Sequence, residues 1–192
     1  CFRLRPYRSG PDVLIDATQI IPLPESADYE VKVRAQEKEK KKVLGARQNF
    51  FRRFWAQLID RSRERTQLLA NRSTTPDQWI SAAIGRTGFG LHASLTQTDT
   101  KVECYIRLPA GEERSLAAFE ALRAQKASIE EAFGEPLVWQ DLPGRQGCRI
   151  CINRPGGWAA PESEWAGMQD EIIGALIRLE AALKKPIQDL KL

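Results

Sequence analysis

The sequence predicts an α+β fold in which antiparallel β-hairpins pack against helices. Two observations support this prediction. Pairs of short segments alternate apolar and polar residues on either side of turn-rich clusters, which is the pattern of hairpins. Longer segments between these pairs repeat apolar residues at helical spacing. The expected order is a leading hairpin and a helical connector, followed by helix–β–β–helix–β–β–helix.

The leading hairpin is expected at the start of the chain. Phe2 and Leu4 alternate with arginines, and Val13 and Ile15 repeat this period after a turn-rich cluster. The second strand is expected to end in the segment 20–24, where two prolines remove backbone donors and fix φ. A hairpin this short cannot bury its own apolar face, so we expect it to complete a domain whose body lies upstream.

A charged connector and an aromatic helix follow. The connector is rich in Lys and Glu, as a solvated helix is. From Ala46 to Leu69, aromatic residues including Phe51, Phe54 and Trp55 fall at helical spacing, and we expect them to be core. The chain is therefore expected to have three parts: a hairpin over residues 1–27, a helical connector over 28–45, and a C-terminal α+β domain over 46–192.

The C-terminal domain is expected to continue with alternating short elements. Glycines at positions 85, 88 and 90 precede a strand, so they permit a tight turn and do not form a dinucleotide site. In the next hairpin, His92 lies on the solvent face as a solvated side chain. The elements expected are a short helix over 78–84, a hairpin over 91–108, a helix over 112–133 stopped by Gly134, a hairpin over 137–152, and a helix from about 161 to 185 ended by Pro186.

Positive charge is concentrated in one stretch of the chain. The net charge is +4 and the pI is about 9.0, yet twelve basic and only four acidic residues lie between Arg34 and Arg72. A basic segment followed by a mildly acidic body indicates a surface that faces a polyanion. No apolar run approaches the roughly 20 residues needed to cross a bilayer, so no membrane partner is expected.

The aromatic helix carries the candidate binding site. Guanidinium groups between aromatic positions can meet phosphates, so nucleic acid is the expected partner. The alternatives are a solvated helix face, or pairing of these arginines with acids of the last helix such as Glu164, Asp170 or Glu171. A second hypothesis is a protein–protein or homodimer interface built on Phe51 and Trp55 or on Trp158 and Trp165. The candidate nucleic-acid-binding residues are Arg47, Arg52, Arg53, Arg61, Arg63 and Arg65.

No catalytic, metal or cofactor site is predicted, so this part of the protein is not expected to be an enzyme. Cys148 and Cys151 have the spacing of half a metal site, but an alternating strand puts them on opposite faces. Cys1 and Cys104 add no second pair of that spacing, and His92 is the single histidine. We expect reduced thiols and a cytoplasmic protein.

Several short motifs resemble a family of uncharacterised bacterial proteins. The resemblance covers essentially the whole chain and depends on the order and spacing of the motifs. The motifs are Cys1-Phe2-Arg3-Leu4 to Pro6-Tyr7, Gln19 to Glu25, Tyr29, Asn49-Phe50-Phe51, Phe54-Trp55, Trp79-Ile80, Ile129-Glu130, Phe133-Gly134, Leu137-Val138-Trp139 and Arg149-Ile150.

In that family a nuclease-like module of the PD-(D/E)xK restriction type precedes a C-terminal domain of unknown function. The resemblance implies an upstream nuclease-like domain in the same chain, which would hold the metal-binding carboxylates and the lysine. None of those residues maps onto this sequence. The resemblance therefore implies a non-catalytic accessory domain of a restriction- or defence-type protein.

Overall fold

The structure is a computed structural model that describes residues 1–19, 24–109 and 111–191. The chain forms two compact units, Cys1–Ala46 and Arg47–Leu192. The first unit contains the predicted hairpin, in which β1 (Phe2–Ser9) pairs antiparallel with β2 (Asp12–Gln19). Gly10 has a φ of 65° in the turn, a conformation that glycine adopts without strain. The exit predicted over residues 20–23 lies outside the described residues.

Helix α1 (Pro24–Ser62) begins in the first unit and ends in the second. The prediction of a separate connector and a helix ending at Leu69 was wrong, since one helix covers both and stops at Ser62. Ser62 is buried, and its hydroxyl donates to the carbonyl of Ile59 at 2.7 Å, after which the chain enters tight turns. Leu69 lies in the turns that follow α1, and its side chain is buried. Its helical spacing from the apolar residues of α1 is therefore coincidental.

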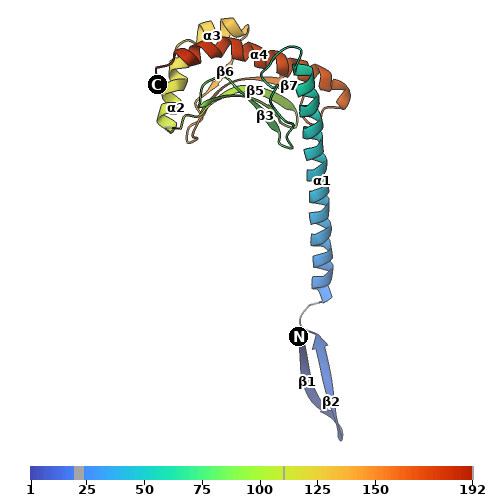
Figure 1. The fold of residues 1–192 in the computed structure, drawn as a ribbon. Helices are drawn as coiled ribbons and strands as arrows, with labels where there is room; N and C mark the ends of the chain where they lie inside the picture. Colours follow the sequence, from blue (N-terminus) through green and yellow to red (C-terminus); the bar gives the residue numbers. More distant parts are fainter. Residues whose placement is uncertain (20–23, 110, 192) are drawn as a thin grey trace. The chain divides into compact units, whose positions relative to one another are not determined.

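The second unit contains a five-stranded antiparallel sheet with the strand order β3-β4-β5-β7-β6. Figure 1 shows helices α2, α3 and α4 along one side of this sheet. The strands are β3 (Trp79–Ala83), β4 (Phe89–Leu95), β5 (Asp99–Ile106), β6 (Val138–Gln140) and β7 (Cys148–Pro155). The antiparallel pairs β4–β5 and β6–β7 confirm the two predicted hairpins.

The segment from Trp79 to Ala83 corrects the predicted order of elements, because it is a strand and not a short helix. A helix of seven residues has little stability of its own, whereas this segment gains a full ladder with β4. Ile80 and Ala82 are buried while the alternate residues are not, as a strand with one covered face requires. The unit is thus helix–β–β–β–helix–helix–β–β–helix, which keeps the α+β class that the sequence predicted.

Two of the predicted helix boundaries also change. The helix expected over 112–133 is two helices, α2 (Glu112–Arg123) and α3 (Lys126–Phe133), separated by a tighter turn in which Gln125 N donates to Leu122 O. The predicted stop at Gly134 is confirmed, with a left-handed φ of 93°. The last helix, α4 (Trp165–Asp189), follows the short 3₁₀ helix η1 (Glu162–Glu164).

Pro186 lies inside α4 and does not end it. A proline this close to a helix end removes only one internal hydrogen bond. The carbonyls of the last turn are satisfied from outside, because Arg86 donates to the carbonyls of Ile187, Gln188 and Leu190. That contact is between residues about one hundred positions apart, and local sequence gives no sign of it.

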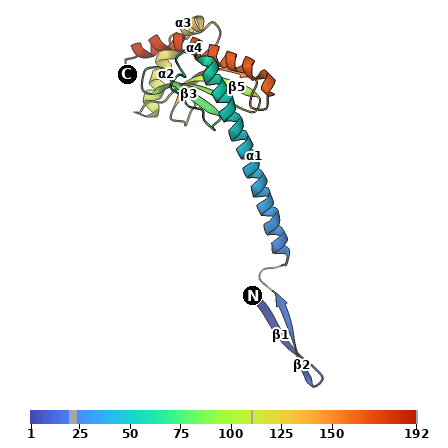
Figure 2. The ribbon, with the colours of Figure 1, turned by 45° about the vertical axis from the view of Figure 1, so that its right-hand side comes forward.

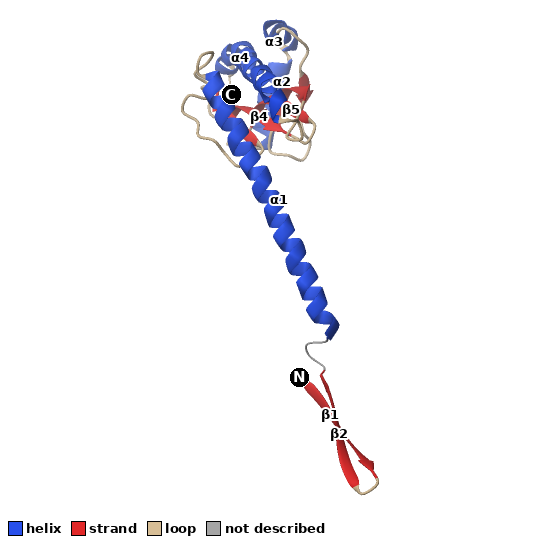
Figure 3. Cartoon of the chain, turned by 90° about the vertical axis from the view of Figure 1, so that its right-hand side faces the viewer, coloured by secondary structure: helices blue, strands red, loops and turns tan. Residues whose placement is uncertain are grey.

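The core lies between the sheet and the helices. Alternate residues of β4 and β5 are buried on this covered face, as predicted, and α4 packs its apolar stripe over them. The side chains of the alternate residues point to the opposite face of the sheet. Figures 2 and 3 show α4 against the strands from two further directions. The buried positions are Phe89, Leu91, Ala93 and Leu95 on β4, and Thr100, Val102, Cys104 and Ile106 on β5.

Candidate functional site

The candidate arginines surround a buried aromatic cluster at the end of α1. Phe51, Phe54 and Trp55 are buried, and the Trp55 indole donates to the carbonyl of Asp77 at 2.8 Å. Phe54 also meets Trp165 of α4 edge to face, with ring centroids 5.4 Å apart. The predicted core role of these aromatics is confirmed. Phe51, Trp55 and Trp165 are buried within the unit itself, so their side chains are not accessible to the interface that the second hypothesis placed on them. Trp158, the fourth residue of that hypothesis, is partly buried.

Acidic side chains near α4 pair with the arginines. Arg61 binds Asp170 at 2.6 Å, and Arg65 contacts the other oxygen of that carboxylate at 3.4 Å. Arg53 pairs with Glu162. Of the acids suggested as alternative partners, Asp170 is therefore used. All of these side chains are at least two-fifths exposed, so each pair contributes only about 0–1 kcal/mol.

The other three arginines have different surroundings. Arg63 meets Asp60 at 3.6 Å. Arg47 donates to Gln78 at 3.2 Å, and its guanidinium lies 5.0 Å from the centre of the Trp158 ring. Arg52 is exposed and has no carboxylate partner among the residues the structure describes. Three carboxylates therefore form ion pairs with four of the six arginines, and the cluster keeps an excess of positive charge.

The side of the sheet away from the helices, here named the open face, brings together a second group of polar and aromatic side chains. Antiparallel register places Ser81, His92, Glu103 and Cys151 side by side on four neighbouring strands. Ser81, His92 and Glu103 alternate with buried positions, so they belong to the face away from the helices. Cys151 pairs with Glu103 on this face and is 1% exposed, but it is not part of the hydrophobic core cluster. The open face comprises Trp79, Ser81, His92, Ser94, Lys101, Glu103, Tyr105, Val138, Gln140, Arg149, Cys151 and Asn153.

An ion pair lies at the centre of the open face. Arg149 Nη1 is 3.3 Å from Glu103 Oε2, and His92 Nδ1 is 3.9 Å from Glu103 Oε1. Only 19% of the Arg149 side chain and 13% of the Glu103 side chain are exposed. Glu103 Oε2 and Arg149 Nε are buried without a hydrogen-bond partner among the described residues. Buried polar atoms of this kind mark a place where a further polar group would be accommodated.

Three rings form a diagonal row across β3, β4 and β5. Trp79 stacks on His92 with centroids 5.5 Å apart and planes 23° apart, and Tyr105 lies 6.0 Å on the other side of His92. Glycine at position 90 leaves room for the imidazole, since a Cβ there would come within 2.8 Å of His92 Nε2. Gly147 likewise leaves room for Tyr105, since a Cβ at position 147 would lie 2.7 Å from the Tyr105 hydroxyl. The rings therefore occupy space that these two glycines leave open.

The surroundings of His92 lower its pKa. Burial is the main cause, a nearby Arg72 acts in the same direction, and Glu103 opposes both. The imidazole is consequently neutral at neutral pH. The predicted location on the solvent face is correct, but the side chain is only 27% exposed and stacked, not free in solvent.

Burial raises the pKa of the thiols of Cys104, Cys148 and Cys151, and no metal cluster is present in the described part of the chain. Burial raises the pKa of Cys104 to about 12 and that of Cys148 to about 11, so neither is a thiolate near neutral pH. Within residues 1–19, 24–109 and 111–191, no three His, Cys, Asp or Glu side chains are grouped so as to hold a metal ion.

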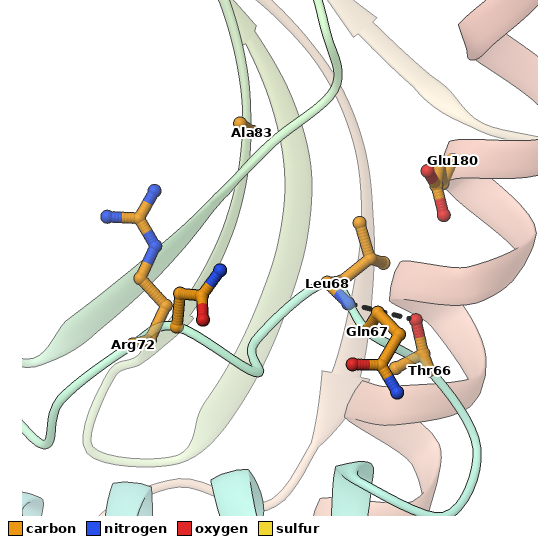
Figure 4. A pocket seen from close by; sticks show the side chains of 7 residues that line it. Thr66, Gln67, Leu68, Arg72, Ala83 and Glu180 are labelled. Carbon is orange, nitrogen blue, oxygen red and sulfur yellow. Dashed lines mark hydrogen bonds between the residues drawn. The ribbon is translucent and has the colours of Figure 1, made fainter.

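Two hollows lie beside the edge strand β3. One has a volume of about 340 Å³ and is lined by Trp79 and Ser81 together with the loop 71–77. The other is about 510 Å³, with Arg72 on one side and Glu180 of α4 on the other, as Figure 4 shows. Both are lined by Asn71 and Arg72, so they adjoin each other along the edge of the sheet.

Sequence reasoning found the arginines of α1 but missed the open face. Trp79 was assigned to a helix, and Glu103, Tyr105 and Arg149 were not proposed as site residues. A usable signal was present: in each strand the positions opposite the apolar ones carry rings or charges. The register that aligns them depends on strand pairing between segments far apart in the chain.

Residues 50–187 match the family described as a domain of unknown function (DUF4268), and the chain belongs to this family. No curated protein matches the chain, and no solved structure matches it. None of the helices described here is at once long enough and apolar enough to pass through a membrane.

Proposed function

We propose that this chain is a non-catalytic accessory domain of a bacterial restriction- or defence-type nuclease-like protein, and that it engages nucleic acid through the arginines of α1 and the turn after it. The observation that supports this proposal best is the surplus of exposed guanidinium groups over carboxylates. Three acids pair with four arginines, and Arg52 faces solvent with no carboxylate partner in the described part of the chain.

The ion pairs of these arginines are compatible with phosphate binding. Pairs between exposed side chains contribute little to stability, so a phosphate can replace the carboxylate at small cost. Arginine also binds phosphate in a bidentate manner, and duplex binding gains further from the release of condensed counterions. Arg61 and Arg65 share one carboxylate, which leaves donors available on both.

Replacement of Arg53 and Arg61 together by alanine tests the proposal. We expect weaker binding of every DNA duplex alike, and a salt dependence of log K reduced by about one for each lost phosphate contact. Fluorescence anisotropy titrations between about 50 and 200 mM salt, conditions chosen to span a strong salt effect, measure both quantities. The matched control is Arg114→Ala with Arg123→Ala, two exposed arginines of α2.

A purely structural role for these arginines gives a different result. The double variant would then lose thermal stability by breaking the pairs with Glu162 and Asp170, while its duplex binding and salt slope stayed at the values of the native chain. That outcome contradicts the proposal.

The non-catalytic part of the proposal has its own test. The purified chain, incubated with magnesium or manganese, is expected to cleave neither DNA nor RNA, because no metal-holding cluster occurs in the described part of the chain. Gel assays with labelled single strands and duplexes measure this. Cleavage that co-purifies with the chain and persists in independent preparations would show that it is an enzyme.

A further inference from the structure

We propose that the open face of the sheet and the hollow beside Trp79 form a second binding site, and that its ligand is single-stranded nucleic acid. In this site an unpaired base stacks on Trp79, and Arg72, Lys101 and Arg149 meet the phosphates. None of the six candidate arginines lines this hollow, although Arg47 and Arg52 contact its loop through Gln78 and Thr74. The residues of the proposed site are different ones, so this inference does not depend on the function proposed above.

The exposed indole of Trp79 provides the stacking surface. Trp79 is 45% exposed, although it is a large apolar side chain. His92 stacks against it on the open face, whereas the 340 Å³ hollow is lined by Trp79 and by the loop 71–77 but not by His92. Trp79 therefore lines the hollow, and the imidazole that stacks on it does not. A base that enters the hollow meets the free side of the indole, and stacking of this kind accepts any base.

The hollow has the size and lining of a small-ligand site. Its volume of about 340 Å³ lies at the lower end of the range for such sites. Ser73, Thr75 and Ser81 provide hydroxyl groups beside the indole, and Arg72 provides a cation. The adjoining 510 Å³ hollow shares Arg72, so a chain of nucleotides has space to continue past the first base.

Positive charge on and beside the open face exceeds negative charge. Arg72 is exposed and Lys101 half-buried, and neither has an ion pair among the described residues. Arg149 has one partner, Glu103, and its Nε is buried without a hydrogen-bond acceptor in the described structure. Asp77 also lines the hollow, so the three cations face two carboxylates, Glu103 and Asp77. Glu180 at the adjoining hollow is paired with Lys184. The site keeps a surplus of one positive charge, which favours a polyanion.

The same features argue against a protein partner. The centre of a protein–protein interface is enriched in aromatic residues and arginine, but it is depleted in lysine and in the acidic residues, which the open face carries at Lys101 and Glu103. Here the centre holds the pair Glu103–Arg149, and the large exposed apolar side chains, Trp79 and Val138, lie on the two edge strands. A base-paired duplex is excluded from the stacking contact, because its base faces are already occupied by neighbouring bases.

His92 supports the rings and does not bind an anion at neutral pH. Its two faces are directed at Trp79 and Tyr105, and burial keeps it uncharged. Gly90 and Gly147 leave the space for His92 and Tyr105, so the row of rings is held close to the sheet. This holds Trp79 in a fixed orientation before the base binds, which lowers the entropy cost of binding.

The test compares single-stranded and duplex ligands on the whole chain. Labelled twelve-nucleotide oligomers of dT and of rU, and a matching duplex, are titrated against the native protein and against Trp79→Ala. We expect Trp79→Ala to weaken binding of both single strands about 5- to 150-fold, which corresponds to the roughly 1–3 kcal/mol of one stacked base. Trp79→Phe is expected to restore most of the affinity. The dT and rU arms show whether DNA or RNA is preferred.

A matched control and an internal probe sharpen this test. Leu116→Ala removes an apolar side chain of similar exposure, 40% against 45%, from helix α2 on the other side of the sheet and is expected to leave binding unchanged. Trp79 is the one tryptophan among the exposed large apolar side chains of the described residues, so oligomer binding should quench its fluorescence, and this quenching should vanish in Trp79→Phe.

Three results would overturn the inference. The first is equal affinity of Trp79→Ala and the native chain for dT and rU when circular dichroism shows both folded. The second is a loss of duplex affinity in Trp79→Ala that equals or exceeds the loss of single-strand affinity, measured in the Arg53→Ala, Arg61→Ala background so that the arginines of α1 do not contribute. The third is a change in sedimentation of the native chain that Trp79→Ala abolishes without any effect on oligomer binding, since that would make the open face a contact between copies of the chain. The α1 variant Arg53→Ala with Arg61→Ala distinguishes the two sites, because it should weaken duplex binding and leave the fluorescence quenching by dT in place.

Discussion

The two surfaces that carry positive charge in the second unit differ in how that charge is neutralised. At the end of α1 the arginines lie over a buried aromatic cluster and pair with carboxylates near α4. On the open face Trp79 is itself accessible to solvent. Glu103 is the one carboxylate on the open face among the described residues, and it pairs with Arg149. The charge count along the sequence points to α1. The contacts show that unpaired cations next to exposed rings occur on the open face as well, so a count of charges alone does not locate a binding surface.

The largest effect is expected from breaking the aromatic cluster beneath the arginines. Trp55→Ala removes a fully buried indole and its hydrogen bond to Asp77, and should lower the free energy of unfolding by about 3–5 kcal/mol. Urea denaturation followed by far-UV circular dichroism measures this loss. Trp79→Ala on the open face is the matched comparison and should cost about 1 kcal/mol or less, since that indole is largely exposed. Similar losses for the two variants would remove the difference between the two surfaces.

An intermediate effect is expected from breaking one ion pair on each surface. Arg149→Met leaves the mostly buried carboxylate of Glu103 without its guanidinium partner, and should cost about 1–3 kcal/mol. Arg61→Met removes one partner of Asp170, whose side chain is already half exposed to water, and should lower the free energy of unfolding by less than about 1 kcal/mol. Both values come from thermal unfolding at neutral pH. If Arg61→Met proves the more costly, the arginines of α1 are structural to a greater degree than their exposure indicates.

The smallest effect is expected from the titration of His92. Its pKa in the folded protein lies below the unfolded value of 6.5, so the unfolded chain takes up the proton first as the pH falls. Stability should therefore decrease as the pH drops below about 6.5 and stop responding to this group below its folded pKa. The difference in melting temperature between the native chain and His92→Gln, followed from about pH 8 to pH 5, isolates this contribution. A native chain that gained stability relative to the variant on acidification would show that Glu103, not burial, dominates the surroundings of His92.

Much of the fold could be predicted because alternation along a strand is a local property. The buried residues Leu91 to Ile106 alternate in the sequence, and the structure buries the expected members. The same reasoning failed for Trp79 to Ala83, where a short apolar segment has no period that separates helix from strand. The prediction of helix ends also failed, because α1 stops at Ser62 and the helix expected over 112–133 is interrupted at Gln125. Buried side chains lie on both sides of each turn, and their packing, not local propensity, sets the end of the helix.

The candidate sites were less predictable, because their decisive contacts join residues far apart in the chain. The sequence left open whether the arginines bind an anion or pair with acids of the last helix. Glu162 and Asp170 reach Arg53 and Arg61 from over one hundred residues away. The row from Trp79 to Tyr105 likewise depends on the register of three strands. Neither relation has a signature within a short window of sequence.

The sequence by itself determined the α+β class, the two central hairpins, the aromatic core of α1 and the positions that carry charge, because periodicity and composition act over neighbouring residues. The tertiary structure alone decided that β3 completes a five-stranded sheet, that acids near α4 neutralise arginines of α1, and that Trp79, His92 and Tyr105 form one row. Strand register and packing between distant elements are set by the free energy of the whole unit, since each pairing gains its stability only when the rest of the core is in place.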